Sequence, residues 1–405
     1  MGVKLWDSTN GIILKKGDRM RIREINRVDD FKSMRGTWND VLAKGRDKNI
    51  FLTWEWLFEW WGHFSDNKKL KILMIEDRDE IIGIIPLLCS TYRTFLFSHD
   101  VVENIGLNSS DYGGIIYSDP DDGQLKEMFS LIKYYLDNNK LTLRFDQIPG
   151  DSKFFNILKN PSFSQDSMFI GEKNTGFSPY ILIQSSLDDH LKMLSTKFRG
   201  NLRKGEKKIE KKIGHIQFKK FSTTISLEKN LIDFWEMHQK KMNYQGVPCF
   251  STTQKGFLTE VAKKFAQNGW LNLSFLDING QHASGVLGFE YYGKYYYYQT
   301  AFDPDYSNSV GNIHILYILK DLIGRGLKEF DFLRGEEAYK LRWQPKLRSN
   351  NRFVMMTKGP ISRLKFKMLN YLFLFEEIKK HSLLENYRLY CYRIKQMEES
   401  KKNKI

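Results

Sequence analysis

Residues 295–343 read YYYYQTAFDPDYSNSVGNIHILYILKDLIGRGLKEFDFLRGEEAYKLRW. Four tyrosines open a predicted strand, Asp303-Pro304 marks a turn, and Gly311 stands at the start of an apolar, helical stretch. A second predicted strand, KEFDFLRG, follows. A strand that leads through small residues into a helix can hold an anion, because free N–H groups and the helix dipole both attract negative charge. This segment is the first candidate for a ligand site.

An internal repeat extends outward from this segment. LNLSFLDINGQHASGVLGFEYY, at 271–292, reads as two strands around the hairpin signal Asn279-Gly280, followed by the tyrosine strand, a helix over about 313–323 and KEFDFLRG. Earlier in the chain, LKILMIEDRDEIIGIIPLL reads as two strands, followed by DYGGIIYSDP, a helix over about 124–135 and the strand LTLRFDQIP. Two copies of one α/β unit explain this order.

The two copies differ where the chain enters the helix. The first enters through Asp119-Pro120-Asp121-Asp122, whose carboxylates would cap the helix and repel a phosphate. The second enters through 307–312, SNSVGN, which carries no charge. We therefore expect the second copy to accept an anion, with ordinary N-capping by Ser309 and Asn312 as the alternative.

The charge of the chain is concentrated in two segments. The 405 residues carry a formal net charge of +15, with ten basic and two acidic residues in 197–220 and twelve and five in 358–405. In the first segment, apolar residues at three- and four-residue intervals predict a basic helix over 187–213 with Arg199 and Arg203 on its polar face. A phosphate-bearing ligand, an anionic polymer and an acidic neighbouring domain all remain open as its partner, beside a simple solvated face.

The basic tail, 358–405, shows apolar spacing typical of two amphipathic helices, which dock on the protein or lie on an anionic membrane. The start of the chain lacks a secretory apolar core, and no run of about 18 apolar residues occurs. We expect a cytoplasmic protein, with peripheral contact at the inner face of the membrane through the tail as an option. Cys89, Cys249 and Cys391 are isolated, so neither a disulfide framework nor a metal site is indicated.

The segment AFDPDYSNSVGNIHILYILKDLIGRGLKEFDFLRGEEAYKLRW resembles the C-terminal part of CelD/BcsL-type acetyltransferases, a branch of the GNAT superfamily associated with cellulose and exopolysaccharide biosynthesis. FLTWEWLFEWW and LSTKFRGNLRKGEKKIEKK resemble other segments of that branch. The resemblance implies an α/β fold of tandem GNAT-like lobes, each a mixed twisted sheet flanked by helices, followed by a helical tail. We expect lobes at 1–180 and 181–357 and the tail at 358–405.

The resemblance also implies a donor and a place for it. GNAT-like lobes bind acyl-CoA, with the pantetheine beside a central strand and the pyrophosphate at the next helix N-terminus. Carried onto this chain, the donor-binding residues are Tyr298, Gln299, Ser309, Val310, Gly311, Asn312 and Arg334. The loop offers Gly311 alone where GNAT loops carry closely spaced glycines, and the related FemAB-type proteins use aminoacyl-tRNA instead.

Direct acyl transfer needs a base, donors for the oxyanion and an acid near the leaving group. The segment after the second strand offers Asp331, Glu336, Tyr339 and Lys340 as the catalytic candidates. Glu337 is an alternative to Glu336 as base, and surface ion pairs or packing are the structural alternatives for this group. His282 and His314 are isolated histidines, for which structural roles are the commoner outcome.

An acceptor site is expected in the first lobe, assisted by the basic helix. The candidates are Trp56 and Glu55, which lie off the helical stripe of the aromatic cluster at 51–61, Asp111 and Tyr112 in a glycine-bordered loop, and Arg199 and Arg203. The acceptor would be an amine or hydroxyl of a carbohydrate or cell-envelope precursor. A FemAB-like aminoacyltransferase, in which tRNA is the nucleic-acid partner, and a non-catalytic envelope scaffold are the alternatives.

Overall fold

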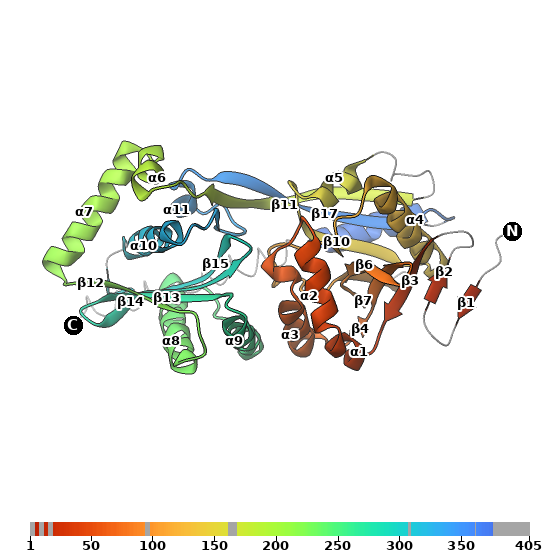
Figure 1. Cartoon of the computed structure of the whole chain (residues 1–405), viewed down its shortest axis with the longest axis horizontal. Helices are drawn as coiled ribbons and strands as arrows, with labels where there is room; N and C mark the ends of the chain where they lie inside the picture. The colour runs from red at the N-terminus through yellow and green to blue at the C-terminus, as the bar shows by residue number, and fades with distance from the viewer. Residues whose placement is uncertain are drawn as a thin grey trace, which may run out of the picture. The chain divides into compact units, whose positions relative to one another are not determined.

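The computed structural model describes residues 5–7, 12–14, 19–93, 98–160, 168–306, 309–360 and 362–375. It divides the chain into two compact units (Figure 1). Unit 1 comprises Met1–Ser178 and Arg348–Met368, and unit 2 comprises Pro179–Leu347 and Leu369–Ile405. Each unit combines strands and helices, as the α/β prediction requires. The chain passes between the units within two long strands, β11 (Met168–Leu182) and β17 (Lys346–Thr357).

Unit 1 contains a mixed set of strands and helices. Its elements are β1 (Leu5–Asp7), β2 (Ile12–Leu14), β3 (Met20–Ile25), α1 (Val28–Ser33), α2 (Arg35–Lys44), η1 (Ile50–Leu52), α3 (Trp54–Phe64), β4 (Lys69–Leu70), β5 (Ile72–Asp77), β6 (Glu80–Ile85), β7 (Leu87–Arg93), β8 (Ser98–Asn104), β9 (Ile116–Tyr117), α4 (Asp122–Asn139), β10 (Thr142–Pro149) and α5 (Lys153–Lys159). Strands β1-β2-β3-β5-β6-β9 form one sheet, and β4, β7, β8, β10 and β17 lie side by side in another. A core that includes Met128, Leu131 and Tyr135 of α4 fills the space against these strands.

Unit 2 places helices on both faces of its strands. Its elements are α6 (Leu187–Met193), α7 (Thr196–Lys212), β12 (Ile216–Phe221), α8 (Leu227–Gln245), α9 (Thr252–Gln267), β13 (Leu271–Ile278), β14 (Gln281–Tyr291), β15 (Lys294–Phe302), α10 (Val310–Gly324), β16 (Glu329–Asp331) and α11 (Ala338–Leu341). The strand order is β12-β13-β14-β15-β16-β11, where β11 spans Met168–Leu182. Helices α8 and α9 cover one face, and α7 and α10 lie together on the other (Figure 1).

The predicted repeat has a counterpart in the pairing of the strands. In unit 2, β15 and β16 run parallel with α10 between them, and β11 pairs antiparallel with β16. In unit 1, β8 and β10 run parallel with α4 between them, and β17 (Lys346–Thr357) pairs antiparallel with β10. The sequence prediction did not include β7 and β8, which pair antiparallel, so the first copy was predicted with two strands too few.

The basic helix expected over 187–213 is two helices. The first helix, α6, ends at Met193, and the second, α7, begins at Thr196. Ser195 is the N-cap of α7, and its hydroxyl accepts a hydrogen bond from the Phe198 N–H. In the tail, a helix covers 362–375, and the second expected amphipathic helix lies outside the described residues. Helices in the described ranges are too short or too polar to cross a membrane.

Candidate functional site

The central feature of unit 2 is an opening between its two parallel strands. β16 pairs with β15 only along Lys294–Tyr296, whereas β15 continues to Phe302. The pairing of β14 with β15 shifts register between Leu287 and Phe289, so that Tyr297 and Tyr298 together oppose Gly288. A bulge of this kind turns backbone groups away from the regular ladder. The far half of β15 therefore keeps β14 as its neighbour on one side, beyond the bulge, and has no ladder with β16 on the other.

The predicted donor residues on β15 lie in this divergent part. Tyr298 and Gln299 are half-buried, and the Tyr298 ring lies 5.3 Å from that of Phe289. The structure thus places both residues at the opening, with their backbone groups next to the bulge.

Helix α10 follows β15 and begins with the other predicted donor residues. Its first turn contains no acidic residue, and a Cβ added to Gly311 would meet no atom within 4 Å. Asn312 holds a buried side-chain oxygen to which none of the described residues donates a hydrogen bond. Val310 differs from these neighbours because its side chain is buried in a cluster with Ile209, so only its backbone is available to a ligand. Ser309 precedes the helix as N-cap without a capping side-chain hydrogen bond, so the capping alternative is not met by Ser309.

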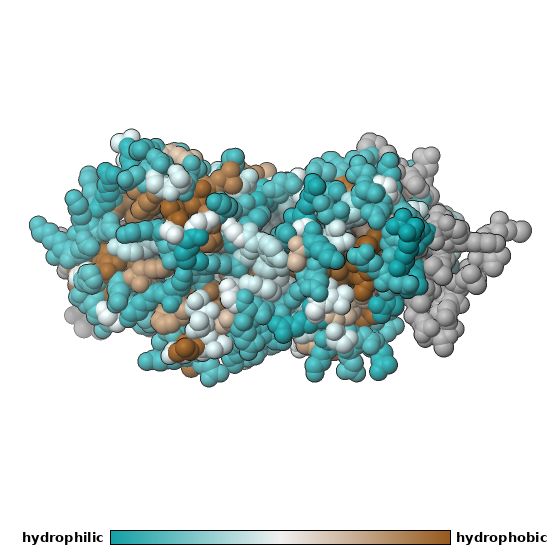
Figure 2. All heavy atoms as spheres, viewed as in Figure 1, coloured by the Kyte–Doolittle hydropathy of each residue, from teal (hydrophilic) through white to brown (hydrophobic). Residues whose placement is uncertain are grey.

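Helix α7 brings positive charge to the start of α10. A Cβ at Gly205 would lie 3.4 Å from Ser309 Cβ, and the Tyr317 hydroxyl donates to Glu206 at 2.9 Å. Lys204 and Lys208, which flank Gly205 on the helix surface, are exposed. Figure 2 shows that the surface around α7 is mostly hydrophilic. Arg203 is exposed as well, whereas Arg199 is half-buried and its Nη1 lies 3.5 Å from the Leu191 carbonyl oxygen of α6.

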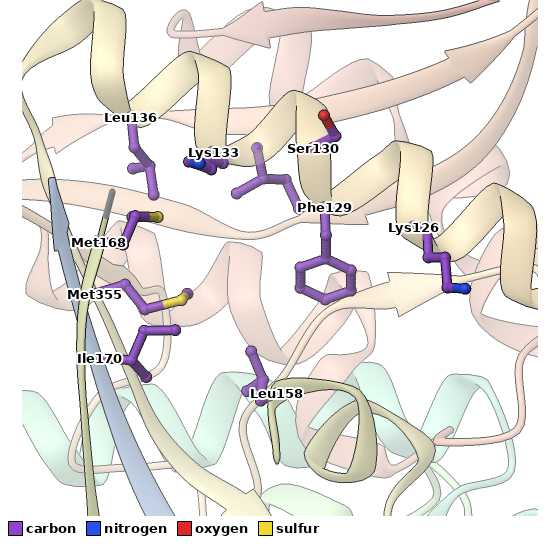
Figure 3. A pocket seen from close by; sticks show the side chains of 10 residues that line it. Lys126, Phe129, Ser130, Lys133, Leu136, Leu158, Met168, Ile170 and Met355 are labelled. Atoms are coloured by element: carbon purple, nitrogen blue, oxygen red, sulfur yellow. The ribbon is translucent and has the colours of Figure 1, made fainter. Parts of the chain in front are cut away.

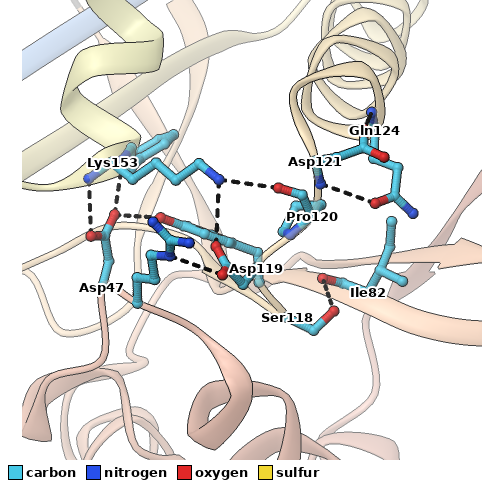
Figure 4. Close-up of polar contacts among 11 residues, drawn as sticks. Asp47, Ile82, Ser118, Asp119, Pro120, Asp121, Gln124 and Lys153 are labelled. Atoms are coloured by element: carbon cyan, nitrogen blue, oxygen red, sulfur yellow. Dashed lines mark hydrogen bonds and ion pairs between the residues drawn. The ribbon is translucent and has the colours of Figure 1, made fainter.

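The corresponding helix of unit 1 has its N-terminus filled by protein groups. Asp121 caps α4 in a capping box with Gln124. Asp119 accepts from Arg46 at 2.9 Å and from Lys153 at 3.4 Å (Figure 4). Carboxylates therefore occupy the position where an anion would bind. The sequences of the two copies predict this difference between their helix N-termini.

The predicted catalytic segment after β16 folds as a compact loop. Asp331 is fully buried, and its carboxylate accepts from the Leu333 N–H at 2.8 Å, which holds Leu333 at a φ of 60°. Lys340 is also buried, and its ammonium donates to the Arg334 carbonyl at 2.7 Å and pairs with Glu337 at 2.9 Å. These contacts stabilise the conformation of the loop.

The remaining members of this segment are more accessible. Glu336 and Glu337 are exposed, and Arg334 is half-buried. Tyr339 is half-buried against the core, where burial, followed by the nearby Tyr297 and Glu337, raises its pKa. A raised pKa keeps the phenol protonated, which is the form that an acid toward a leaving group requires.

The predicted acceptor residues of unit 1 are buried. Glu55 is 1% exposed and is held by Arg35 at 2.8 Å and Asn39 at 2.9 Å. Trp56 donates from its indole to Ser110 at 2.8 Å, and Asp111 is 9% exposed. Tyr112 is likewise buried, with its hydroxyl 3.2 Å from Arg348. All four side chains are buried, and contacts inside unit 1 hold Glu55, Trp56 and Tyr112, so the structure does not present them as an open acceptor surface.

Two histidines that the sequence offers as alternatives have structural partners. The His314 ring lies between the hydroxyls of Ser284 at 2.7 Å and Ser274 at 3.0 Å, and burial lowers its pKa to about 3. The His282 ring lies 2.5 Å from an oxygen of Asp277. Both therefore belong to the framework that supports β13 and β14.

Sequence reasoning missed Lys241, which lies on α8 against the far half of β15. Its Nζ donates to the carbonyl and hydroxyl oxygens of Thr300 at 2.9 and 2.6 Å. The signal was present in the sequence. Lys241 follows Phe234 and Met237 at helical spacing on the buried face of α8, where a lysine is unexpected.

A separate pocket lies in unit 1. Its volume is about 220 Å³, and its walls are mainly apolar side chains of α4, α5, β11 and β17, including Phe129, Leu158 and Met355 (Figure 3). Lys126 and Lys133 of α4 stand at its edge. None of the residues predicted for chemistry lines this pocket.

Comparisons with known proteins agree with this geometry. Residues 196–341 match the family model described as acetyltransferase (GNAT) domain. Among solved structures, FemX aligns with a TM-score of 0.55 at 12% identity over 78% of this chain and 95% of FemX. A Bacteroides thetaiotaomicron protein of unknown function aligns at 0.52 and 12% over 80% and 97%. L-PGS from Bacillus licheniformis aligns at 0.50 and 12% over 83% and 96%.

These identities support a shared fold and leave the substrates open. No curated protein shows significant sequence similarity to the chain. The family match covers the whole run from α7 through α11, which contains the opening of β15 and the start of α10. Residues 196–341 are similar to a GNAT acetyltransferase domain, and the chain shares its α/β fold with FemX and L-PGS.

Proposed function

We propose that the protein transfers an acyl group from acyl-CoA to an amine or hydroxyl by direct attack. The observation that carries this proposal is the opening beyond Tyr296, where β15 continues without β16 and carries a bulge. A pantetheine arm contains amide groups, and such groups bind well to an exposed strand edge by main-chain hydrogen bonds. The thioester would then lie beside the bulged residues Tyr297 and Tyr298.

The start of α10 is the proposed pyrophosphate site. A 15-residue helix without acidic residues in its first turn favours an anion through its dipole and free N–H groups. The exposed Lys204 and Lys208 of α7 add positive charge nearby. The open space at Gly311 leaves room for phosphate oxygens to approach the backbone.

The acceptor class rests on the sequence resemblance. Similarity to CelD/BcsL-type proteins favours a carbohydrate or cell-envelope precursor, modified in the cytoplasm. The helix over 362–375 adds an amphipathic surface, since Leu364, Tyr371 and Phe375 are 58%, 70% and 62% exposed beside basic residues. We propose that this helix gives peripheral contact with an anionic membrane surface, where envelope precursors are assembled.

A charge placed at Gly311 tests the donor site. Acetyl-CoA should raise the Tm of the wild-type protein, and Gly311→Asp should remove this shift, because a carboxylate there repels phosphate. Gly311→Asn is the matched control, having nearly the same size without the charge, and should keep most of the shift. Thermal unfolding with acetyl-, butyryl- and palmitoyl-CoA provides the measurement.

The same experiment can also contradict the proposal. No shift in wild-type Tm with any of the three acyl-CoAs would contradict acyl-CoA as donor. Equal shifts in wild type and Gly311→Asp would place the donor elsewhere.

A second candidate is aminoacyl transfer from tRNA, as in FemAB-type proteins. The exposed basic face of α7 favours it, because several lysines and arginines on one helix can neutralise successive phosphates. Charged tRNA would then bind with an affinity that falls steeply with salt, while acyl-CoA would leave the Tm unchanged.

A further inference from the structure

Lys241 occupies the buried face of α8 at the opening of β15. The preceding turns of α8 bury Leu231, Phe234 and Met237, and Lys241 continues that stripe. Its Nζ lies 2.9 Å from the Thr300 carbonyl oxygen and 2.6 Å from the Thr300 hydroxyl. Thr300 lies four residues past Tyr296, where β15 last pairs with β16. The amine is therefore anchored to the divergent part of the strand.

Lys241 has no close counterion among the described residues. Among the described residues, no carboxylate lies within 4 Å of its Nζ, and Glu337, which acts on it from farther away, is paired with Lys340 at 2.9 Å. Its neighbour Lys240 pairs with Asp303 at 3.2 Å, and the Phe302 ring lies 5.7 Å from the Lys241 amine. Burial lowers the pKa of Lys241 to about 8, with the charge of Glu337 opposing the change.

The nearby histidine and the buried tyrosines do not supply a base. His238, one turn earlier on α8, is 1% exposed and stacks on Phe250 at 5.0 Å, and burial lowers its pKa to about 4. Tyr297 and Tyr339 have raised pKa values, first because of burial, so they stay protonated. Among the described residues, Lys241 combines direct hydrogen bonds to the divergent part of β15 with a lowered pKa, whereas Glu337 is paired with Lys340.

The two bonds to Thr300 can be made by a neutral amine. A neutral lysine has two N–H groups and one lone pair, and Thr300 offers two acceptors, its carbonyl and its hydroxyl. With both N–H groups engaged, the lone pair points away from Thr300. We propose that Lys241 is the general base of this acyltransferase, accepting the proton of the attacking amine or hydroxyl. This inference rests on the proposed acyl-CoA-dependent function.

The proton and bond changes of the step balance. The acceptor's nitrogen or oxygen attacks the thioester carbonyl carbon, and Lys241 takes up the proton that the acceptor loses. The new C–N or C–O bond forms as the C–S bond of acyl-CoA breaks, and the CoA thiolate leaves. The Lys241 ammonium then returns its proton to the thiolate or to water, which regenerates the neutral base.

Hydrolysis of acetyl-CoA tests the step without knowledge of the acceptor, because water must lose a proton in the same way. CoA release by the wild type should rise with pH to a plateau above about pH 8. Lys241→Arg keeps the charge and can donate to Thr300, yet arginine stays protonated, so CoA release should fall by roughly 100-fold or more at every pH. Lys240→Arg, at the adjacent position, is the control and should match the wild type.

Three results distinguish failure of this inference from failure of the proposed function. Hydrolysis by Lys241→Arg at the wild-type rate and pH profile would overturn the base role and leave the donor site intact. Loss of the acetyl-CoA Tm shift in Lys241→Arg would also overturn it, by showing that Lys241 acts in binding. Should the wild type neither bind nor hydrolyse acetyl-CoA, the proposed function fails.

An NMR titration measures the pKa of Lys241 directly, whatever the outcome of the kinetic experiment. In protein labelled with ¹⁵N and ¹³C in its lysine side chains, the resonance missing from Lys241→Arg should titrate near pH 8. A midpoint near the ordinary lysine value of about 10.4 would overturn the inference, since the amine would then be charged at working pH.

Discussion

At the scale of single residues, the core of unit 2 holds a histidine that burial keeps neutral. The buried ring of His314 lies between Ser284 and Ser274, so one ring nitrogen can donate and the other can accept. Burial lowers the pKa of His314 to about 3. The neutral ring therefore links α10 to β13 and β14, and burial disfavours a proton on it, although the charge of Asp277 opposes this effect.

This burial makes stability depend on pH in a defined direction. The unfolded chain binds a proton on His314 near its ordinary pKa of about 6.5, whereas the folded protein resists protonation until about pH 3. The free energy of unfolding should therefore fall as pH drops below 6.5, by roughly 1 kcal/mol per pH unit for this histidine. Urea unfolding at pH 7.5 and 5.0 measures the change.

The contribution of His314 is isolated by substitution. His314→Asn should lower stability at pH 7.5, and it should also reduce the loss between pH 7.5 and 5.0. His215→Gln removes an exposed histidine and should leave that loss unchanged. Equal losses in wild type and His314→Asn would contradict the assignment.

At the scale of elements, α7 and α10 pack closely because of a glycine. A Cβ at Gly205 would lie 3.4 Å from Ile313 Cδ1 and from Ser309, whereas a Cβ at Gly200, on the same helix, would meet nothing within 4 Å. The packing places the basic surface of α7 beside the start of α10. The distance between the two helices at this point depends on the small size of residue 205.

Substitutions at these two glycines test the packing. Gly205→Ala should be tolerated, because an ordinary contact replaces the gap and alanine favours a helix by about 1 kcal/mol over glycine. Gly205→Leu should destabilise the protein by about 1–3 kcal/mol through overpacking. Gly200→Leu, measured by the same urea unfolding, should cause no comparable loss. A similar cost at both positions would contradict the close approach at Gly205.

Local patterns in the sequence predicted these elements well. The Asn279-Gly280 signal is confirmed as the turn of β13–β14, with φ of 53° and 80° at the two residues. The apolar run after Gly311 is confirmed as α10, which begins at Val310. The break between α6 and α7 was not predicted, because the apolar stripe continues across Leu194 and outweighs the capping signal of Ser195.

At the scale of the whole molecule, sequence patterns predicted the repeat and missed long-range pairing. The strand β17 begins in unit 2 and pairs in unit 1 with β10, with Phe353 opposite Phe145. Such pairing between residues far apart in the chain leaves no periodic trace. The same reason hid Lys241, whose importance comes from a contact with Thr300, 59 residues away. By contrast, the absence of acidic residues at the start of α10 was readable, because it is local.

The central claim is that an acyl donor binds at the opening of β15 and at the start of α10. Hydrogen–deuterium exchange with and without acetyl-CoA tests it most directly, because each backbone segment is followed separately. We expect slower exchange in peptides covering Tyr297–Thr300 and Val310–Ile313, and unchanged exchange at the acid-capped start of α4. Unchanged exchange at both unit 2 segments, or protection confined to unit 1, would contradict the account.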